Sequence, residues 1–227
     1  MRIAAQVLSG CLIAAASPAL LANGGGGMSS PSMSMPRMQS PADKAREAYN
    51  DGVRDVKKAD KAQDAAAHAS DAGKKDKATQ EAHDAYAAAL AKFQEALQQD
   101  PGLAEAWNYY GYTSRKLGKY EDALEAYGKA LTLKPGYPDA LEYRGEAYLA
   151  LNRIDDAKQS YLDLYAGNRS LAGKLLSAMK GWATTQRSGG GTDGANLDEL
   201  DKWIQEREQI ARQTAALTRA GTAASWH

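Results

Sequence analysis

The chain has 227 residues, of which 28 are basic and 28 acidic, so it carries no net charge. Without an excess of positive charge, neither nucleic acid nor an anionic membrane surface is expected as a partner. A composition with 12 Tyr, one Phe and abundant Ala is typical of closely packed helices rather than of a sheet, and it predicts an all-α fold. The single cysteine, Cys11, excludes an internal disulfide framework.

The first 22 residues have the pattern of a leader. Arg2 precedes an apolar stretch from Ile3 to Leu21, and a small residue follows it. We therefore expect a signal peptide over residues 1–22 and an exported, periplasmic protein with no membrane span after cleavage. Two alternatives stay open. One is an uncleaved anchor helix; the other is a lipid on Cys11, because Leu8-Ser9-Gly10-Cys11 is similar to the lipobox of bacterial lipoproteins.

Residues 23–41 contain Gly, Ser, Pro and Met without helical or strand periodicity, which predicts a disordered tether. The thioethers of Met28, Met33, Met35 and Met38 are chemically suitable ligands for Cu(I) in an oxidising compartment. Copper handling is therefore an alternative function, although low complexity alone accounts for the same residues. We expect no cofactor.

Two consecutive segments match when the sequence is compared with a shifted copy of itself. At one constant shift the identical pairs are Ala106 and Ala140, Tyr109 and Tyr143, Gly111 and Gly145, Leu117 and Leu151, Asp122 and Asp156, Ala123 and Ala157, and Tyr127 and Tyr161. A period of about 34 residues, which these pairs share, is the signature of tetratricopeptide (TPR) repeats, in which hairpins of two antiparallel helices stack into a solenoid. We therefore expect repeat units at residues 104–137 and 138–171.

Residues 104–137 also resemble the TPR pattern position by position. Small residues at Gly111 and Ala123 allow two helices to cross closely, while rings beside them fill the remaining space. Tyr110 and Ser114 depart from the pattern. The structural repeat residues are Trp107, Gly111, Ala123, Tyr127 and Pro135 in the first of these units, and Gly145, Ala157 and Tyr161 in the second.

A degenerate unit is expected before them, at residues 42–103. Gly52 is the best candidate for its repeat glycine position and Ala89 for its alanine position, and these residues are 37 positions apart. The same two positions are only 12 apart in the next unit, at Gly111 and Ala123. Helical periodicity continues through the extra residues. We therefore predict two lengthened helices that form an arm, with a turn near Gly73 and fast amide exchange over residues 62–77.

Three segments follow the repeats. The amphipathic residues 172–187 occupy the place of the capping helix that covers the last unit of a TPR array. A Gly-rich linker at residues 188–195 leads to an amphipathic helix at residues 196–219, and residues 220–227 are expected to form a disordered tail. The C-terminal helix either folds back onto the cap or groove, or remains a free recognition helix, and both alternatives stay open.

No group of residues has the spacing of a catalytic or metal-binding motif. His68 and His83 fall on opposite halves of the expected arm, and His227 is the last residue. The carboxylates fall on helical faces where Lys and Arg can pair with them. The sequence has neither a Gly-rich phosphate loop nor a nucleophile elbow. We therefore expect no enzymatic activity and no bound metal.

The resemblance to TPR proteins implies a concave groove lined by five positions of each unit's first helix. These positions are Glu105, Asn108, Tyr112, Arg115 and Lys116, then Asp139, Glu142, Glu146, Leu149 and Ala150, with weaker counterparts at Arg46, Tyr49, Val53, Val56 and Lys57. The mixture suits a peptide or helix with polar and apolar contacts. Asn108 and Tyr112 stand where the family's carboxylate clamp needs Lys and Asn, so the chaperone C-termini that this clamp grips are not expected as partners.

These expectations describe a TPR scaffold or adaptor of the bacterial exported type. It would be a non-catalytic interaction module that binds a protein or peptide outside the cytoplasm. The alternatives are a copper-handling protein that uses the Met-rich tether, and an envelope-assembly lipoprotein anchored through Cys11. The partner and the oligomeric state are not predicted, because TPR units fix the shape of a groove and not its ligand.

Overall fold

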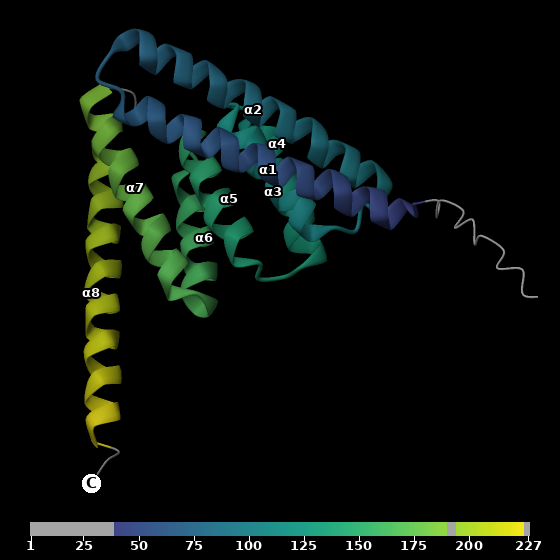
Figure 1. The fold of residues 1–227 in the computed structure, drawn as a ribbon. Coiled ribbons are helices and arrows are strands. Elements are labelled where there is room, and N and C mark those ends of the chain that lie inside the picture. The colour runs from purple at the N-terminus through teal and green to yellow at the C-terminus, as the bar shows by residue number, and fades with distance from the viewer. Residues whose placement is uncertain (1–38, 190–193, 225–227) are drawn as a thin grey trace, which may run out of the picture. The chain divides into compact units, whose positions relative to one another are not determined.

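The computed structural model describes residues 39–189 and 194–224, and every regular element within them is an α-helix (Figure 1). The helices are α1 (Pro41–His68), α2 (Ala72–Gln99), α3 (Ala104–Lys116), α4 (Tyr120–Leu133), α5 (Pro138–Ala150), α6 (Ile154–Gly167), α7 (Arg169–Gly189) and α8 (Gly194–Ala224). The predicted all-α fold is confirmed. The expected signal peptide, Cys11, the four tether methionines, His227 and linker residues 190–193 lie outside the described residues.

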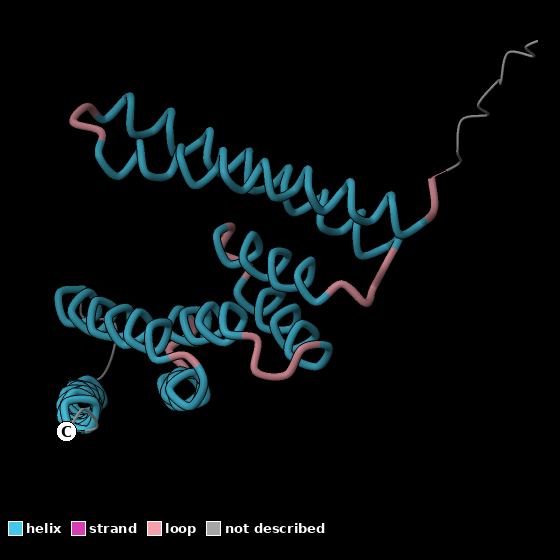
Figure 2. Tube along the Cα trace, turned by 60° about the horizontal axis from the view of Figure 1, so that its bottom comes forward, coloured by secondary structure: helices cyan, strands magenta, loops and turns pink. Residues whose placement is uncertain are grey.

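The first six helices form successive hairpins. α1 packs on α2, α3 on α4 and α5 on α6, while α2 contacts α3 and α4 contacts α5; Figure 2 shows the short loops between them. The turn inside each short hairpin needs a residue with positive φ. Gly118 takes a φ of 76°, and Asn152, which stands at the equivalent position one repeat later, takes 58°. The same turn therefore recurs at the repeat period.

The first hairpin is much longer than the others, because α1 and α2 have 28 residues each, whereas α3 to α6 have 13 or 14. Ser40 caps α1: its Oγ accepts from the Asp43 amide at 3.1 Å, so the helix begins at Pro41, inside the expected tether. The turn lies at residues 69–71, and the prediction near Gly73 was wrong. Asp71 accepts from the Lys74 amide at 3.0 Å, which starts α2 before Gly73 is reached.

Small residues let the two helices of a hairpin approach one another. A Cβ atom on Gly111 would lie 2.6 Å from the Tyr127 ring, and one on Gly52 would lie 2.7 Å from the Phe93 ring. Gly111 and Tyr127 belong to one short hairpin, whereas the whole insertion separates Gly52 from Phe93 in the sequence. Because the two close approaches are nevertheless alike, the long hairpin keeps the crossing of a short one.

The last hairpin departs from this rule. A Cβ atom on Gly145 would meet Cδ2 of Leu175 at 2.5 Å, so α7 and not α6 fills the space over this glycine. Tyr161, which stands in the position of Tyr127, packs instead against Trp203 of α8 with ring centroids 5.2 Å apart. The C-terminal helices have therefore taken over part of the packing that the repeat pattern gives to the hairpin itself.

The C-terminal helix is docked along its first half. Leu197, Leu200 and Ile204 are buried against α6 and α7, and Arg187 of α7 pairs with Asp201 at 2.8 Å. Further along α8, Leu217 is 73% exposed. Of the two alternatives left open, docking on the cap is the one observed. α7 extends beyond residues 172–187 at both ends, and α8 continues to Ala224, into the segment expected to be a tail.

Candidate functional site

The residues predicted to line a groove lie on two neighbouring helices. α1 contacts α3, α3 contacts α5, and α5 contacts α7, so the first helices of successive hairpins lie side by side. We define the α3–α5 face by its polar and charged side chains, which are Asn108, Tyr112, Arg115, Asp139, Glu142 and Glu146. All of them belong to α3 or α5, which contact one another.

An ion pair joins the two helices of this face. Nη1 of Arg115 lies 2.6 Å from Oε2 of Glu146. The guanidinium also lies 5.4 Å from the ring centroids of both Tyr112 and Tyr143, within the range of a cation–π contact. Burial raises the pKa of the Tyr143 hydroxyl to about 12, with nearby carboxylates adding to the effect. Arg115 and Glu146 thus hold α3 and α5 in register.

A second polar cluster joins the face to the long hairpin. The Tyr112 hydroxyl donates to Oδ1 of Asp60 at 2.7 Å, and the Tyr86 hydroxyl donates to the same atom at 2.6 Å. Nζ of Lys116 donates to Oε1 of Gln63 at 2.6 Å. Burial, and then the hydrogen bond to Asp60, raise the pKa of Tyr112. We call these five residues the Asp60 cluster.

The sequence pattern did not identify Asp60, Gln63 or Tyr86 as relevant to this face. Asp60 and Tyr112 are 52 residues apart, and the repeat period does not relate them. The only signal in the sequence is that two polar residues, Asp60 and Gln63, interrupt the apolar stripe of α1. Tyr112 and Lys116 therefore have a structural role in the described residues, whatever else they do.

Other predicted groove residues pair within the chain or are buried in its core. Glu105 pairs with Lys134 at 2.9 Å, and Leu149 is only 3% exposed within the core formed with α6 and α7. Leu149 is therefore a core residue and does not line a groove, while Ala150 is exposed. Among the weaker counterparts on α1, Arg46 and Lys57 are exposed, Tyr49 and Val53 are half-buried, and Val56 is buried.

Two buried residues on the face carry acceptors without a partner. Oδ1 of Asn108 accepts no hydrogen bond, and Glu142 makes neither a hydrogen bond nor an ion pair within the described part of the chain. Asn108 is 3% exposed and Glu142 is 6% exposed. Burial raises the pKa of the Glu142 carboxyl, with Lys174 opposing and Glu146 adding to the shift. Such groups are costly to bury unpaired.

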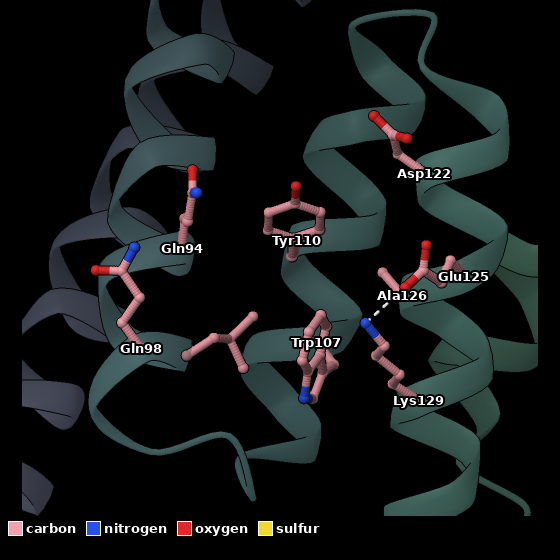
Figure 3. A pocket seen from close by; sticks show the side chains of 9 residues that line it. Gln94, Gln98, Trp107, Tyr110, Asp122, Glu125, Ala126 and Lys129 are labelled. Carbon is pink, nitrogen blue, oxygen red and sulfur yellow. Dashed lines mark ion pairs between the residues drawn. The ribbon is translucent and has the colours of Figure 1, made fainter.

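A cavity of about 340 Å³ lies on another side of α3, between α2, α3 and α4. We call it the lateral pocket (Figure 3). Its floor is formed by Trp107 and Tyr110 of α3. The walls come from Gln94, Leu97 and Gln98 of α2 and from Asp122, Glu125, Ala126 and Lys129 of α4. Nζ of Lys129 lies 4.3 Å from the Trp107 ring centroid and 2.6 Å from Oε1 of Glu125.

Neither metal-binding nor membrane-spanning features occur among residues 39–189 and 194–224. No group of His, Cys, Asp and Glu there has the arrangement of a metal site, and none of the helices combines the length and apolarity needed to cross a bilayer. His68 and His83 are both exposed, on α1 and α2.

Comparisons with known proteins agree with the repeat geometry. Residues 111–152 match a family model described as TPR repeat, and residues 92–125 match a second model described as tetratricopeptide repeat. A solved structure described as the first TPR of Spaghetti (RPAP3) bound to the HSP90 peptide SRMEEVD is similar, with 18% identity and a TM-score of 0.47, over 64% of this chain and 98% of that one. No curated protein matches the sequence. Residues 92–152 are therefore similar to tetratricopeptide repeats.

Proposed function

We propose that this protein is a non-catalytic interaction module that binds a polypeptide segment on the α3–α5 face. The observation that carries the proposal is a pair of unpartnered acceptors: the buried Oδ1 of Asn108, and the carboxylate of Glu142, which makes no hydrogen bond or ion pair within the described residues. These residues stand one repeat apart, at the same place in successive units. A segment that crosses both repeats can offer hydrogen-bond donors at the repeat spacing, as a peptide chain does.

Polar groups that stay unsatisfied in a folded chain call for an explanation. Removing a buried carboxylate from water is unfavourable unless a donor or cation reaches it. Asp139 lies on the same helix as Glu142, is half-buried and likewise has no hydrogen bond or ion pair within the described residues. Nε of Arg115 is an unpartnered donor on the face, but the unpartnered acceptors outnumber it, which favours a segment with amide or cationic donors over an acidic one.

The experiment uses a photo-reactive amino acid in place of Asp139 in the full chain, expressed in the cells that produce it. We expect a discrete polypeptide adduct from position 139 and none from position 155, because Asp155 is 96% exposed on α6 and lies off the face. Glu142→Gln keeps the shape of the face and should reduce the adduct. Equal labelling from both positions, or none from position 139, would refute the proposal.

Alanine substitutions at Tyr112, Arg115 and Lys116 are less informative, since these residues also hold the fold together through Glu146 and Asp60. Loss of binding in such variants would not distinguish lost contacts with the partner from lost stability of the fold. Asp139→Lys is a better variant, because Asp139 has no described contact to lose. It should weaken capture of the partner, with only the small loss of stability that a positive charge in the first turn of α5 brings.

We further propose that the module acts outside the cytoplasm. The support is the leader pattern of residues 1–22, with its apolar stretch after Arg2. Mass spectrometry of the mature protein tests this. A chain that begins at Asn23 is the expected result, whereas an acylated Cys11 would indicate the lipid-anchored alternative and an intact Met1 would refute cleavage.

A further inference from the structure

The lateral pocket contains polar groups that the protein itself does not satisfy. Asp122, Gln94 and Gln98 make no hydrogen bond or ion pair within the described residues, and the Tyr110 hydroxyl makes none either. Figure 3 shows Gln94 and Gln98 on the α2 side of Trp107 and Tyr110, and Asp122 on the α4 side. The pocket therefore presents acceptors around an aromatic floor.

The equivalent set of positions one repeat later, which we call the second groove, holds side chains that pair with one another. A shift by one repeat takes Tyr110 to Arg144, Lys129 to Asp163 and Asp122 to Asp156. Nη2 of Arg144 lies 3.4 Å from Oδ2 of Asp163, and its guanidinium lies 5.9 Å from the Tyr148 ring centroid. An arginine of the chain itself thus occupies the second groove.

The neighbouring acceptors of that second groove are paired as well. Nε of Arg153 lies 2.8 Å from Oδ2 of Asp156, and Gln159 donates to Asp163 at 2.9 Å. In the lateral pocket the residue equivalent to Arg153 is Lys119, and it does not pair with Asp122. In the lateral pocket the position of Asp163 is taken by Lys129, whose cation lies over Trp107, so no cation of the chain lies against Asp122.

The floor of the lateral pocket already accommodates a cation. Nζ of Lys129 sits 4.3 Å from the Trp107 ring centroid, which leaves the Tyr110 ring as the remaining aromatic surface. Glu125 is committed to Lys129, and this contact lowers the pKa of the Glu125 carboxyl. Asp122 is then the free carboxylate of the pocket. With Asp122, Glu125 and Lys129 ionised, the lining carries one net negative charge.

We infer that the lateral pocket binds an arginine side chain of a partner polypeptide. The planar guanidinium can stack on the Tyr110 ring while its N–H groups reach Asp122 and the side-chain oxygens of Gln94 or Gln98. Lysine offers a compact charge without the planar surface, and an acidic side chain would meet Asp122. The observation that favours arginine over other cations is Arg144, which fills the equivalent position of the second groove.

This site goes beyond the proposed α3–α5 face. Tyr110 and Tyr112 are two residues apart, so they point about 200° from one another around α3. The pocket lies between α2, α3 and α4, whereas the face lies on α3 and α5. The two proposals can therefore fail separately: photo-labelling from position 139 tests the face, and titration of the Trp107 indole signal tests the pocket.

The experiment titrates the isotopically labelled full chain with Nα-acetyl-L-arginine methylamide and follows the Trp107 indole N–H resonance by NMR. We expect a saturable shift with a dissociation constant in the millimolar range, as is usual for so small a ligand. Asp122→Asn should weaken the binding about tenfold, because a charge-assisted hydrogen bond is lost. Asp156→Asn, the matched change in the second groove, should leave the binding unchanged.

Two further measurements test whether the lateral pocket binds arginine specifically. The neutral citrulline analogue of the probe should bind about tenfold more weakly than the arginine form. Tyr110→Arg should abolish the shift by filling the pocket as Arg144 fills the second groove, while position 139 still photo-labels. The inference is overturned if the Trp107 signal does not move, if the citrulline or lysine probe binds equally well, if an acetyl-glutamate probe binds instead, or if Asp122→Asn has no effect.

Discussion

The two ends of the helical array are held together by different chemistry. At the N-terminal end, the long hairpin is fixed to α3 by the Asp60 cluster and by rings that pack edge-on, such as Tyr49 against Tyr109 with centroids 5.8 Å apart. At the C-terminal end, α7 and α8 are fixed by an aliphatic core that includes Leu175, Leu200 and Ile204. Hydrogen bonds are directional, whereas aliphatic packing depends mainly on filled volume.

The two ends of the array therefore have different structural roles. The aliphatic end covers the last repeat, as a cap must, and its contribution to stability comes from buried area. The aromatic and polar end fixes the register of a hairpin that would otherwise have only an alanine-rich surface to bury, since Ala59, Ala82, Ala85 and Ala89 form much of it. Between the two ends lies the α3–α5 face, where Asn108 and Glu142 remain unpaired.

The largest effect should come from the aliphatic end. Leu200→Ala removes a side chain that is 0% exposed and should lower the free energy of unfolding by about 3 kcal/mol, as large-to-small core substitutions do. Leu217→Ala on the same helix, where the side chain is 73% exposed, should change it by no more than about 0.5 kcal/mol. Chemical denaturation measures both, and equal effects would mean that α8 is not docked.

The next largest effects on stability are expected at the helix crossings, and they should differ between the two ends. Gly111→Ala places a methyl group against the rigid Tyr127 ring and should cost about 2 kcal/mol. Gly145→Ala should cost less, because the methyl groups of Leu175 can change rotamer. Gly128→Ala is the control: nothing lies within 4 Å of its added Cβ, so it should stabilise by about 0.5 to 1 kcal/mol. A destabilised Gly128→Ala variant would contradict this account of the crossings.

The Asp60 cluster should contribute less than either packing term. Asp60→Ala removes the acceptor shared by Tyr86 and Tyr112, and it should cost about 1 to 2 kcal/mol. Asp64→Ala, one turn further along α1 and exposed, should be near neutral. The melting temperatures of the two variants provide the test. If both lose the same stability, the cluster does not fix the hairpin.

The smallest effect is expected on the α3–α5 face, and it depends on pH. The folded state raises the pKa of Glu142 above its ordinary value of 4.5, so folding favours the protonated carboxyl. The stability is therefore fully present below the ordinary pKa and is lost as pH rises through the raised pKa. Glu142→Gln should increase the melting temperature near neutral pH and not below the ordinary pKa. A gain that is the same at both pH values would contradict this.

The repeat period was enough to predict the hairpins and their crossings. Gly111 and Tyr127 were recognisable because small and large residues recur at fixed spacing, and Gly52 followed from the same pattern once the insertion was allowed for. Such local contacts depend on residues within one unit. The presence of the cap and of the C-terminal helix was likewise predicted from amphipathic spacing.

Contacts between units were not predictable in this way. The bond between Asp60 and Tyr112 depends on how far the long hairpin runs beside α3, and no periodic signal encodes that length. Leu175, and not Tyr161, packs over Gly145, and this depends on the path of α7 after the last repeat. The lateral pocket was not predictable either, because Tyr110 departs from the family pattern and that pattern assigns no pocket to its position.

The long hairpin contacts α3 as far as the Asp60 cluster, and the buried apolar residues of α8 extend as far as Ile204. Residue-resolved amide hydrogen exchange of the full chain tests these two limits most directly. The account predicts strong protection for the parts of α1 and α2 that pack on α3 and for α8 up to Ile204, with fast exchange over residues 62–77 and beyond Leu217. Uniform protection through residues 62–77, or fast exchange at Leu200, would contradict it.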